Sequence, residues 1–125
     1  MICWSITILH WVGKEPKISS FWTCVLEILS GNAKSLNVAT GSVDFLIDKG
    51  FTDAISRLEQ DQWLQIMDEQ ARVMKPSGVI YQFTEEPPEA RLELWNKWLR
   101  STNYKLKIRH SELDFNRFMY RIQFE

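Results

Sequence analysis

The stretch that decides the fold is Val43-Asp-Phe-Leu-Ile-Asp-Lys-Gly-Phe-Thr-Asp-Ala-Ile55. Its apolar first half predicts a buried strand from Val43 to Ile47, and Asp48-Lys49-Gly50 ends that strand and leads into a helix. Ligands of open α/β sheets bind at the carboxyl ends of the strands. The acid and the lysine at this strand end therefore predict a functional site.

The flanking residues alternate between strand-like and helix-like patterns. Upstream, the apolar residues from Val25 to Leu29 suit a strand that is buried on both faces. Downstream, helical spacing predicts one helix from Asp61, its N-cap, to about Lys75, and a second that starts after Pro87-Pro88 and runs to about Arg100. A strand from Gly78 to Phe83 is predicted between them. This alternation favours crossover connections and a mostly parallel sheet.

The C-terminal end of the chain shows two runs in which apolar and polar residues alternate. The first run is Tyr104 to Arg109 and the second is Arg117 to Phe124. Period-two patterns with one polar face predict an antiparallel pair at the edge of a sheet. The predicted fold is therefore α/β and Rossmann-like, with a mostly parallel sheet and an antiparallel C-terminal hairpin.

Composition narrows the functional classes. The chain has 125 residues and a formal net charge of −1, with Lys and Arg scattered along it, which fits one domain and argues against nucleic acid as a partner. Cys3, Cys24, His10 and His110 lie far apart in the sequence. Their spacing predicts neither a disulfide framework nor a metal site.

The N-terminus is apolar but short. Met1 to Gly13 falls below the roughly 20 residues of a membrane span. It also lacks the pattern of a secretory signal or of an organelle transit peptide. We therefore expect no membrane association, and we expect Ile6 to Val12 to form a strand that contributes to the fold.

Four segments carry a family resemblance. They are Leu26-Glu-Ile-Leu-Ser-Gly-Asn-Ala-Lys-Ser-Leu36, Ser42-Val-Asp-Phe-Leu-Ile-Asp-Lys-Gly50, Arg72-Val-Met-Lys-Pro-Ser-Gly-Val-Ile80 and Tyr81-Gln-Phe-Thr-Glu-Glu-Pro-Pro-Glu-Ala-Arg-Leu92. Together with the terminal hairpin, they resemble the second half of the seven-stranded S-adenosylmethionine-dependent methyltransferase fold. The Asp-Lys-Gly turn resembles a protein-lysine methyltransferase subgroup. The fourth segment is most similar, within that subgroup, to the citrate synthase lysine methyltransferases.

The resemblance implies a domain organisation. Residues 25–125 correspond to the C-terminal part of a methyltransferase domain, and residues 1–24 form an atypical N-terminal segment. The glycine-rich cofactor loop of the family is expected upstream of residue 25, where no Gly-x-Gly pattern occurs. Asn32 stands where the family usually has an acid, and Phe51 where the subgroup usually has threonine. The N-terminal part of the fold is therefore expected to be missing or replaced.

The resemblance also implies a reaction and its site. The cofactor is S-adenosyl-L-methionine, the partner is a protein with a target lysine, citrate synthase being the candidate, and the location is mitochondrial, or otherwise cytoplasmic. No metal takes part. The implied catalytic residues are Asp48 and Lys49; Asn32, Ala33 and Asp48 are implied to contact the cofactor; and Gly50, Asp53, Gln82, Thr84 and Glu85 are implied to contact the substrate.

Simpler interpretations of the same residues stay open. Asp48 could cap the following helix, Lys49 could be solvated, Asn32 could belong to a plain turn, and Glu85-Glu86 could be a solvated helix entry. Two alternative functions follow. One is an inactive methyltransferase remnant or splice form that acts through a partner at an exposed strand edge, and the other is an unrelated α/β binding domain.

Overall fold

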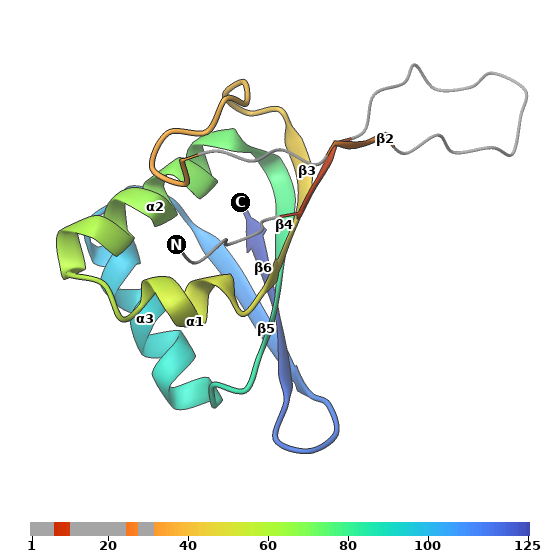
Figure 1. Cartoon of the computed structure of the whole chain (residues 1–125), viewed down its shortest axis with the longest axis vertical. Helices are drawn as coiled ribbons and strands as arrows, with labels where there is room; N and C mark the ends of the chain where they lie inside the picture. Colours follow the sequence, from red (N-terminus) through yellow and green to blue (C-terminus); the bar gives the residue numbers. More distant parts are fainter. Residues whose placement is uncertain (1–6, 11–24, 28–31) are drawn as a thin grey trace, which may run out of the picture.

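The structure is a computed structural model that describes residues 7–10, 25–27 and 32–125. Six strands form one sheet in the order β2-β1-β3-β4-β6-β5. The strands are β1 (Thr7–His10), β2 (Val25–Glu27), β3 (Val43–Lys49), β4 (Met74–Thr84), β5 (Leu106–Glu112) and β6 (Phe118–Phe124). The helices are α1 (Phe51–Ile55), α2 (Gln60–Val73) and α3 (Pro88–Arg100). All three helices lie on the same side of the sheet (Figure 1).

The α/β class and the C-terminal hairpin agree with the sequence analysis, but the sheet is mixed rather than mostly parallel. Among the described strands, only β3 and β4 pair parallel. β1 is antiparallel to both β2 and β3, and β6 is antiparallel to both β4 and β5. After α3 the chain forms β5 at the edge of the sheet. A short turn then leads back to β6, which lies between β4 and β5.

The N-terminal strand predicted at Ile6 to Val12 is confirmed as β1, which covers the β3 edge with Ile8 opposite Leu46. The strand predicted from Val25 is confirmed over β2, although it runs antiparallel to its neighbour. The remaining residues of both predicted strands lie outside the described residues, as do Cys3 and Cys24.

The boundaries of α2 differ from the predicted ones at both ends. Its N-cap is Glu59 rather than Asp61, which lies in the first turn. The helix ends at Val73 instead of Lys75, and β4 begins at once with Met74. Lys75 precedes Pro76, and a residue before proline disfavours the helical conformation. The left-handed φ of 65° at Ser77 then shifts the β3–β4 register, so that the strands come into regular pairing from Val79 onward.

The core lies between the sheet and the helices. The inward faces of β3, β4 and β6 contribute Leu46, Ile80 and Ile122, each 0% exposed. The helices contribute Met67 and a pair of tryptophans, Trp95 and Trp98, that meet edge to face at 5.5 Å. The apolar side chains that recur at helical spacing along α2 and α3 are thus core residues. The outward face of the sheet carries no described helix (Figure 1).

Candidate functional site

The candidate site lies where β3 and β4 end side by side. Asp48 is the cross-strand neighbour of Gln82, and Lys49 is the neighbour of Phe83. The two strands are parallel, so their carboxyl ends meet at one edge, as the sequence predicts. Asp48 is only 1% exposed at this position, whereas Lys49 is exposed.

The turn after β3 needs a glycine and an acid. Gly50 adopts a left-handed φ of 74°, which most residues disfavour, and its N–H donates to the Phe83 carbonyl over 3.1 Å. Asp48 Oδ1 accepts a 2.7 Å hydrogen bond from the Phe51 N–H, and Asp48 Oδ2 accepts one of 3.1 Å from the Thr52 N–H. The capping interpretation of Asp48 is therefore confirmed, since its carboxylate satisfies the first amides of α1.

Opposing effects act on the Asp48 carboxyl. Burial raises its pKa above the ordinary value, and this effect is larger than the opposing ones. The hydrogen bond from the Thr52 hydroxyl, the backbone amides and the nearby Arg91 charge act in the opposite direction. Both oxygens of the Asp48 side chain already accept hydrogen bonds within the protein.

Gln82 links Asp48 to the third helix. Its Nε2 donates to the Thr52 hydroxyl at 2.9 Å and to Asp48 Oδ2 at 3.3 Å. Its Oε1 accepts hydrogen bonds from Arg91 Nη1 and Trp95 Nε1, both at 3.1 Å. One amide thus connects the end of β3, the start of α1 and the buried side of α3.

Arg91 is the functional-site candidate that sequence reasoning missed. It is 0% exposed, although it is the most polar side chain on its helix face. Its guanidinium contacts Asp53, donates to Glu86 Oε2 at 3.0 Å and donates to Thr84 Oγ1 at 3.2 Å. The signal was its spacing, because Arg91, Trp95 and Trp98 follow i, i+4, i+7 and therefore share the buried face.

Three of the substrate residues implied by the resemblance, Asp53, Gln82 and Thr84, contact this guanidinium. Thr84 Oγ1 donates to both Asp53 oxygens at 2.7 Å and accepts the Glu86 N–H at 2.9 Å. We call Asp48, Asp53, Gln82, Thr84, Glu86 and Arg91 the carboxylate cluster. Glu85 is exposed beside it. Acidic residues therefore outnumber basic ones at this edge. The four acids are Asp48, Asp53, Glu85 and Glu86, and the two cations are Arg91 and Lys49.

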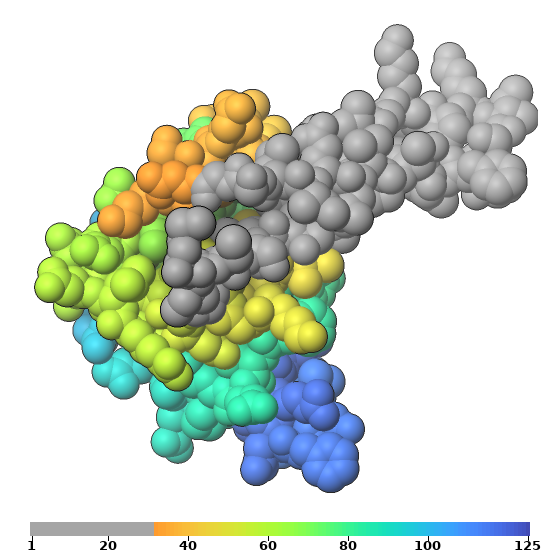
Figure 2. All heavy atoms as spheres, in the orientation of Figure 1, coloured from red at the N-terminus to blue at the C-terminus, as the bar shows by residue number. Residues whose placement is uncertain are grey.

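Asn32 and Ala33, the other implied cofactor residues, are not part of this cluster. Asn32 Oδ1 accepts the Lys34 N–H at 3.0 Å, so the plain-turn interpretation is confirmed for its side chain. The loop that follows is tied to the last turn of α2, where Arg72 donates to the Val38 carbonyl at 2.9 Å. Figures 1 and 2 show this loop (orange) against α2, at the opposite end of β3 from α1.

These positions bear on whether the described residues fit S-adenosylmethionine. The Asp48 oxygens are buried against α1 and Gln82, and the Asn32 oxygen serves its own turn. No Gly-x-Gly turn occurs in the described residues. The side-chain oxygens of Asp48 and Asn32 are therefore already engaged within the protein, and the described residues supply no glycine-rich turn for the adenosine.

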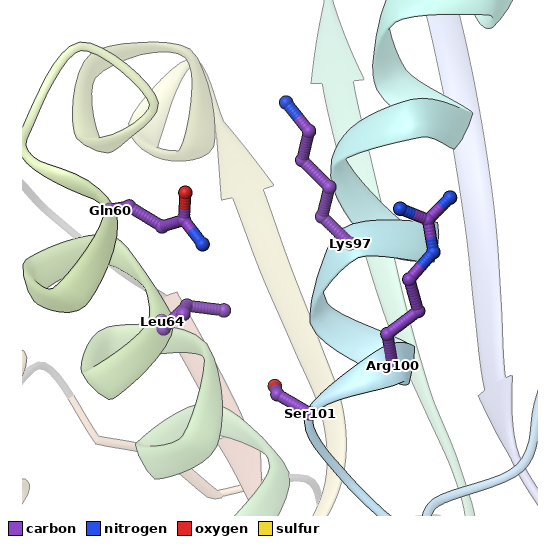
Figure 3. A pocket seen from close by; sticks show the side chains of 5 residues that line it. All are labelled: Gln60, Leu64, Lys97, Arg100 and Ser101. Atoms are coloured by element: carbon purple, nitrogen blue, oxygen red, sulfur yellow. The ribbon is translucent and has the colours of Figure 1, made fainter.

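A separate hollow of about 330 Å³ lies between α2 and α3 and is lined by Gln60, Leu64, Lys97, Arg100 and Ser101 (Figure 3). It shares no residue with the carboxylate cluster. In the part of the chain that the structure describes, no group of three His, Cys, Asp or Glu side chains is arranged to hold a metal ion. Within the same residues, no helix is long and apolar enough to cross a membrane.

Comparison with known proteins places the fold. No family model matches the chain. It is 32% identical over 82 residues to the mitochondrial citrate synthase-lysine N-methyltransferase of Homo sapiens, covering 64% of this chain and 34% of that protein. It is 43% identical over 56 residues to the protein of the same name from Danio rerio, covering 43% of this chain and 22% of that protein. The chain thus spans about a third or less of the curated relatives it matches.

Solved structures agree on the architecture. A methyltransferase from Thermotoga maritima, described as a possible histamine N-methyltransferase, aligns with a TM-score of 0.56 at 12% identity, over 79% of this chain and 64% of that one. A methyltransferase from Methanosarcina mazei also aligns with a TM-score of 0.56, at 17% identity, over 87% of this chain and 72% of that one. The chain has the fold of S-adenosylmethionine-dependent methyltransferases, over part of its extent.

Proposed function

We propose that this chain is part of an S-adenosylmethionine-dependent methyltransferase that acts on a lysine of a protein, and that its described residues form the substrate side of the site. The relatives that it matches are named for methylating a lysine of citrate synthase, which makes citrate synthase the first substrate to test and mitochondria the first location. The similarity runs through about two thirds of this chain, and the chain spans a third of the human protein.

The observation that carries the lysine proposal is the excess of acid at the carboxyl edge of β3 and β4. Asp53 and Glu86 keep 34% and 24% of their side chains exposed, so they meet solvent as well as Arg91. Glu85 adds a third exposed carboxylate. Such an edge attracts the ammonium form of a lysine and orients it, because opposite charges attract across a partly desolvated gap.

The chain's own residues would then position the substrate rather than take its proton. The buried Asp48 carboxyl fixes the Lys49-Gly50 turn, and Gln82 holds that turn against α3. S-adenosylmethionine supplies an electrophilic methyl group when it is bound. Methylation needs the lysine as a neutral amine held close to that group, and proximity of this kind is what a rigid edge provides.

Calorimetry of the purified chain with S-adenosylmethionine, together with mass spectrometry of citrate synthase after incubation with both, tests the proposal. We expect binding and a methylated lysine. Glu85→Gln should lower methyl transfer while changing the free energy of unfolding by less than about 0.5 kcal/mol, since Glu85 is exposed. Glu93→Gln on α3 is the matched control, and it should leave both measurements unchanged.

Two results would contradict the proposal. One is the absence of both binding and transfer at millimolar cofactor with a folded chain. The other is methyl transfer that Glu85→Gln and Glu93→Gln lower equally, because the acidic edge would then have no special part in binding the lysine. Binding without transfer to citrate synthase would keep the methyltransferase and exclude that substrate.

The alternative function, a domain that acts through protein contacts, is favoured by one observation. The outward face of the sheet is uncovered by the described helices and exposes Phe45 by 45% and Phe83 by 36%. All-parallel sheets are normally covered on both faces, whereas antiparallel sheets can leave one face open to solvent, and here only β3 and β4 pair parallel among the described strands. The exposed aromatic side chains over this central pair favour contact with a partner polypeptide.

A further inference from the structure

The turn between β5 and β6 projects from the sheet at the end where β4 leads into α3, beside the carboxylate cluster (Figure 1). Phe118, the first residue of β6, is the cross-strand neighbour of Thr84, the last residue of β4. Tyr120 ties β6 to the same place, because its hydroxyl donates to the Glu86 carbonyl over 2.8 Å. We call residues 113–117 the hairpin tip. Strand pairing and this hydrogen bond fix the position of the tip relative to the cluster.

Phe115 is the unusual residue of the hairpin tip. Its backbone φ is 52° and that of Asn116 is 57°, positive values at both central positions, as in a type I′ turn. The Arg117 N–H closes the turn by donating to the Asp114 carbonyl at 3.2 Å. Asn, Asp and Gly dominate these positions, whereas bulky side chains disfavour a positive φ. Asn116 therefore suits the turn, and Phe115 does not.

Burial does not explain the choice of phenylalanine. Phe115 is 85% exposed, the highest fraction among the large hydrophobic residues that the structure describes, and Leu113 beside it is 43% exposed. Asp114 and Arg117 form an ion pair of 3.8 Å, but both side chains are more than half exposed, so the pair contributes little to stability. An exposed aromatic residue in a disfavoured backbone conformation indicates a role outside the folded chain.

We propose that the hairpin tip binds an apolar depression on the surface of the protein substrate, with Phe115 as the side chain that enters it. Phe115 lies three residues before Phe118, the neighbour of Thr84. At about 3.3 Å per residue of strand, the aromatic contact lies roughly 10 Å from Thr84 and its cluster. A folded protein spans that distance, whereas a free lysine does not. The contact thus selects which lysine reaches the carboxylate cluster.

A protein is favoured over a lipid surface as the occupant. Glu112 and Asp114 precede Phe115 and only Arg117 follows it, so acids outnumber bases around the tip. Anionic membranes attract segments that are rich in Lys and Arg, not segments with this balance. Aromatic side chains are also frequent anchors of protein interfaces. This inference rests on the proposed function, and it adds the surface that recognises the protein.

Phe115→Asn tests the proposal, because Asn accepts a positive φ and removes the aromatic ring. Binding of the full chain to immobilised citrate synthase, the first substrate to test, is measured by surface plasmon resonance. We expect Phe115→Asn to weaken binding at least about tenfold and Phe115→Tyr to keep it within about threefold. Leu58→Asn, at a 42% exposed position between α1 and α2, is the matched control and should leave binding unchanged.

Urea unfolding of the same variants separates recognition from folding. The urea midpoint of Phe115→Asn should equal or exceed that of the native chain, since Asn tolerates the backbone conformation of the turn better. A midpoint that falls would overturn the proposal, because Phe115 would then serve the fold.

Three binding results would also overturn the proposal. Equal binding by the native chain and Phe115→Asn would remove the role of the tip and leave the proposed function in place. Sedimentation with phosphatidylserine vesicles that depends on Phe115 would assign the tip to a membrane. Absence of citrate synthase binding by the native chain would overturn this inference together with the proposed substrate, so the two failures are distinguishable.

Discussion

Replacing Arg91 by methionine should destabilise the chain strongly, because this residue is the buried centre of the carboxylate cluster. Methionine keeps much of the aliphatic volume but removes the hydrogen bonds to Gln82, Thr84 and Glu86 and the contact with Asp53. Breaking a buried ion pair by removing one partner typically costs about 3–5 kcal/mol. Asp53 and Glu86 are partly exposed and regain water, so we expect the lower end, about 3 kcal/mol.

The neutral partners of Arg91 limit the loss further. Gln82 Oε1 keeps its hydrogen bond from Trp95 Nε1, and Thr84 Oγ1 keeps its bonds to Asp53 and to the Glu86 N–H. No neutral group is therefore orphaned by the substitution. The main loss is the bridge that ties α1 and the β4–α3 turn to α3.

Urea unfolding followed by tryptophan fluorescence measures the effect, and Arg100→Met on the exposed side of the same helix is the control, with a change below about 0.5 kcal/mol. A double-mutant cycle with Asp53→Asn should give a coupling of about 1 kcal/mol. A loss below about 1 kcal/mol for Arg91→Met would refute the reasoning, since the desolvation of the guanidinium would then offset its contacts.

Three further substitutions test single features. Burial raises the pKa of Asp48 above its unfolded value of 3.8. The stability that this group contributes is therefore fully present below the unfolded value and is lost as the pH rises through the higher folded value. Urea unfolding from about pH 4 to about pH 8 should then show the stability of Asp48→Asn rising with pH relative to the native chain. Gln70 is 1% exposed, and its amide has no hydrogen-bond partner within the described residues. Gln70→Leu should therefore raise the free energy of unfolding by about 1 kcal/mol. The control Gln65→Leu, at an exposed position, should not raise the free energy of unfolding. Gly50→Ala should cost about 1–2 kcal/mol in thermal unfolding because φ is 74° while the space around the new Cβ is free, and Gly50→Asn should cost less.

The sequence predicts those parts of the fold that repeat a local pattern. The strand from Val43, the helix that ends at Arg100 and the C-terminal hairpin are all found, since period and turn chemistry specify them without distant contacts. The first hairpin strand, however, covers Leu106–Glu112 instead of Tyr104 to Arg109. The direction of the N-terminal strands, in contrast, is not specified by a local pattern. Whether β2 runs with or against its neighbour depends on partners far along the chain, so an apolar run alone cannot decide it.

The candidate site also contains residues that the sequence predicts and residues that it does not. The Asp-Lys-Gly turn and the Gln82–Thr84 strand end are visible in the sequence, because residues at the ends of adjacent parallel strands must meet. Arg91 is harder to assign to the site, because an arginine among Glu and Ala suggests a solvated face, and only its spacing with Trp95 and Trp98 indicates the buried side of α3. Asn32 was assigned to the same site by resemblance, yet its loop is tied to α2 at the other end of β3.

The burial of Asp48 also changes what a mutation there would mean. Its oxygens accept hydrogen bonds from the start of α1 and from Gln82, and its side chain is closed to solvent. Under the proposed function, Asp48 would act through the turn that it holds, as a positioning residue. The groups that a lysine would meet first are Lys49, Glu85 and the exposed parts of Asp53 and Glu86. Loss of activity in an Asp48 variant would thus measure the geometry of the Lys49-Gly50 turn, whereas neutralising Glu85 would measure the attraction for the substrate, and the two should separate as a loss in kcat and a rise in KM.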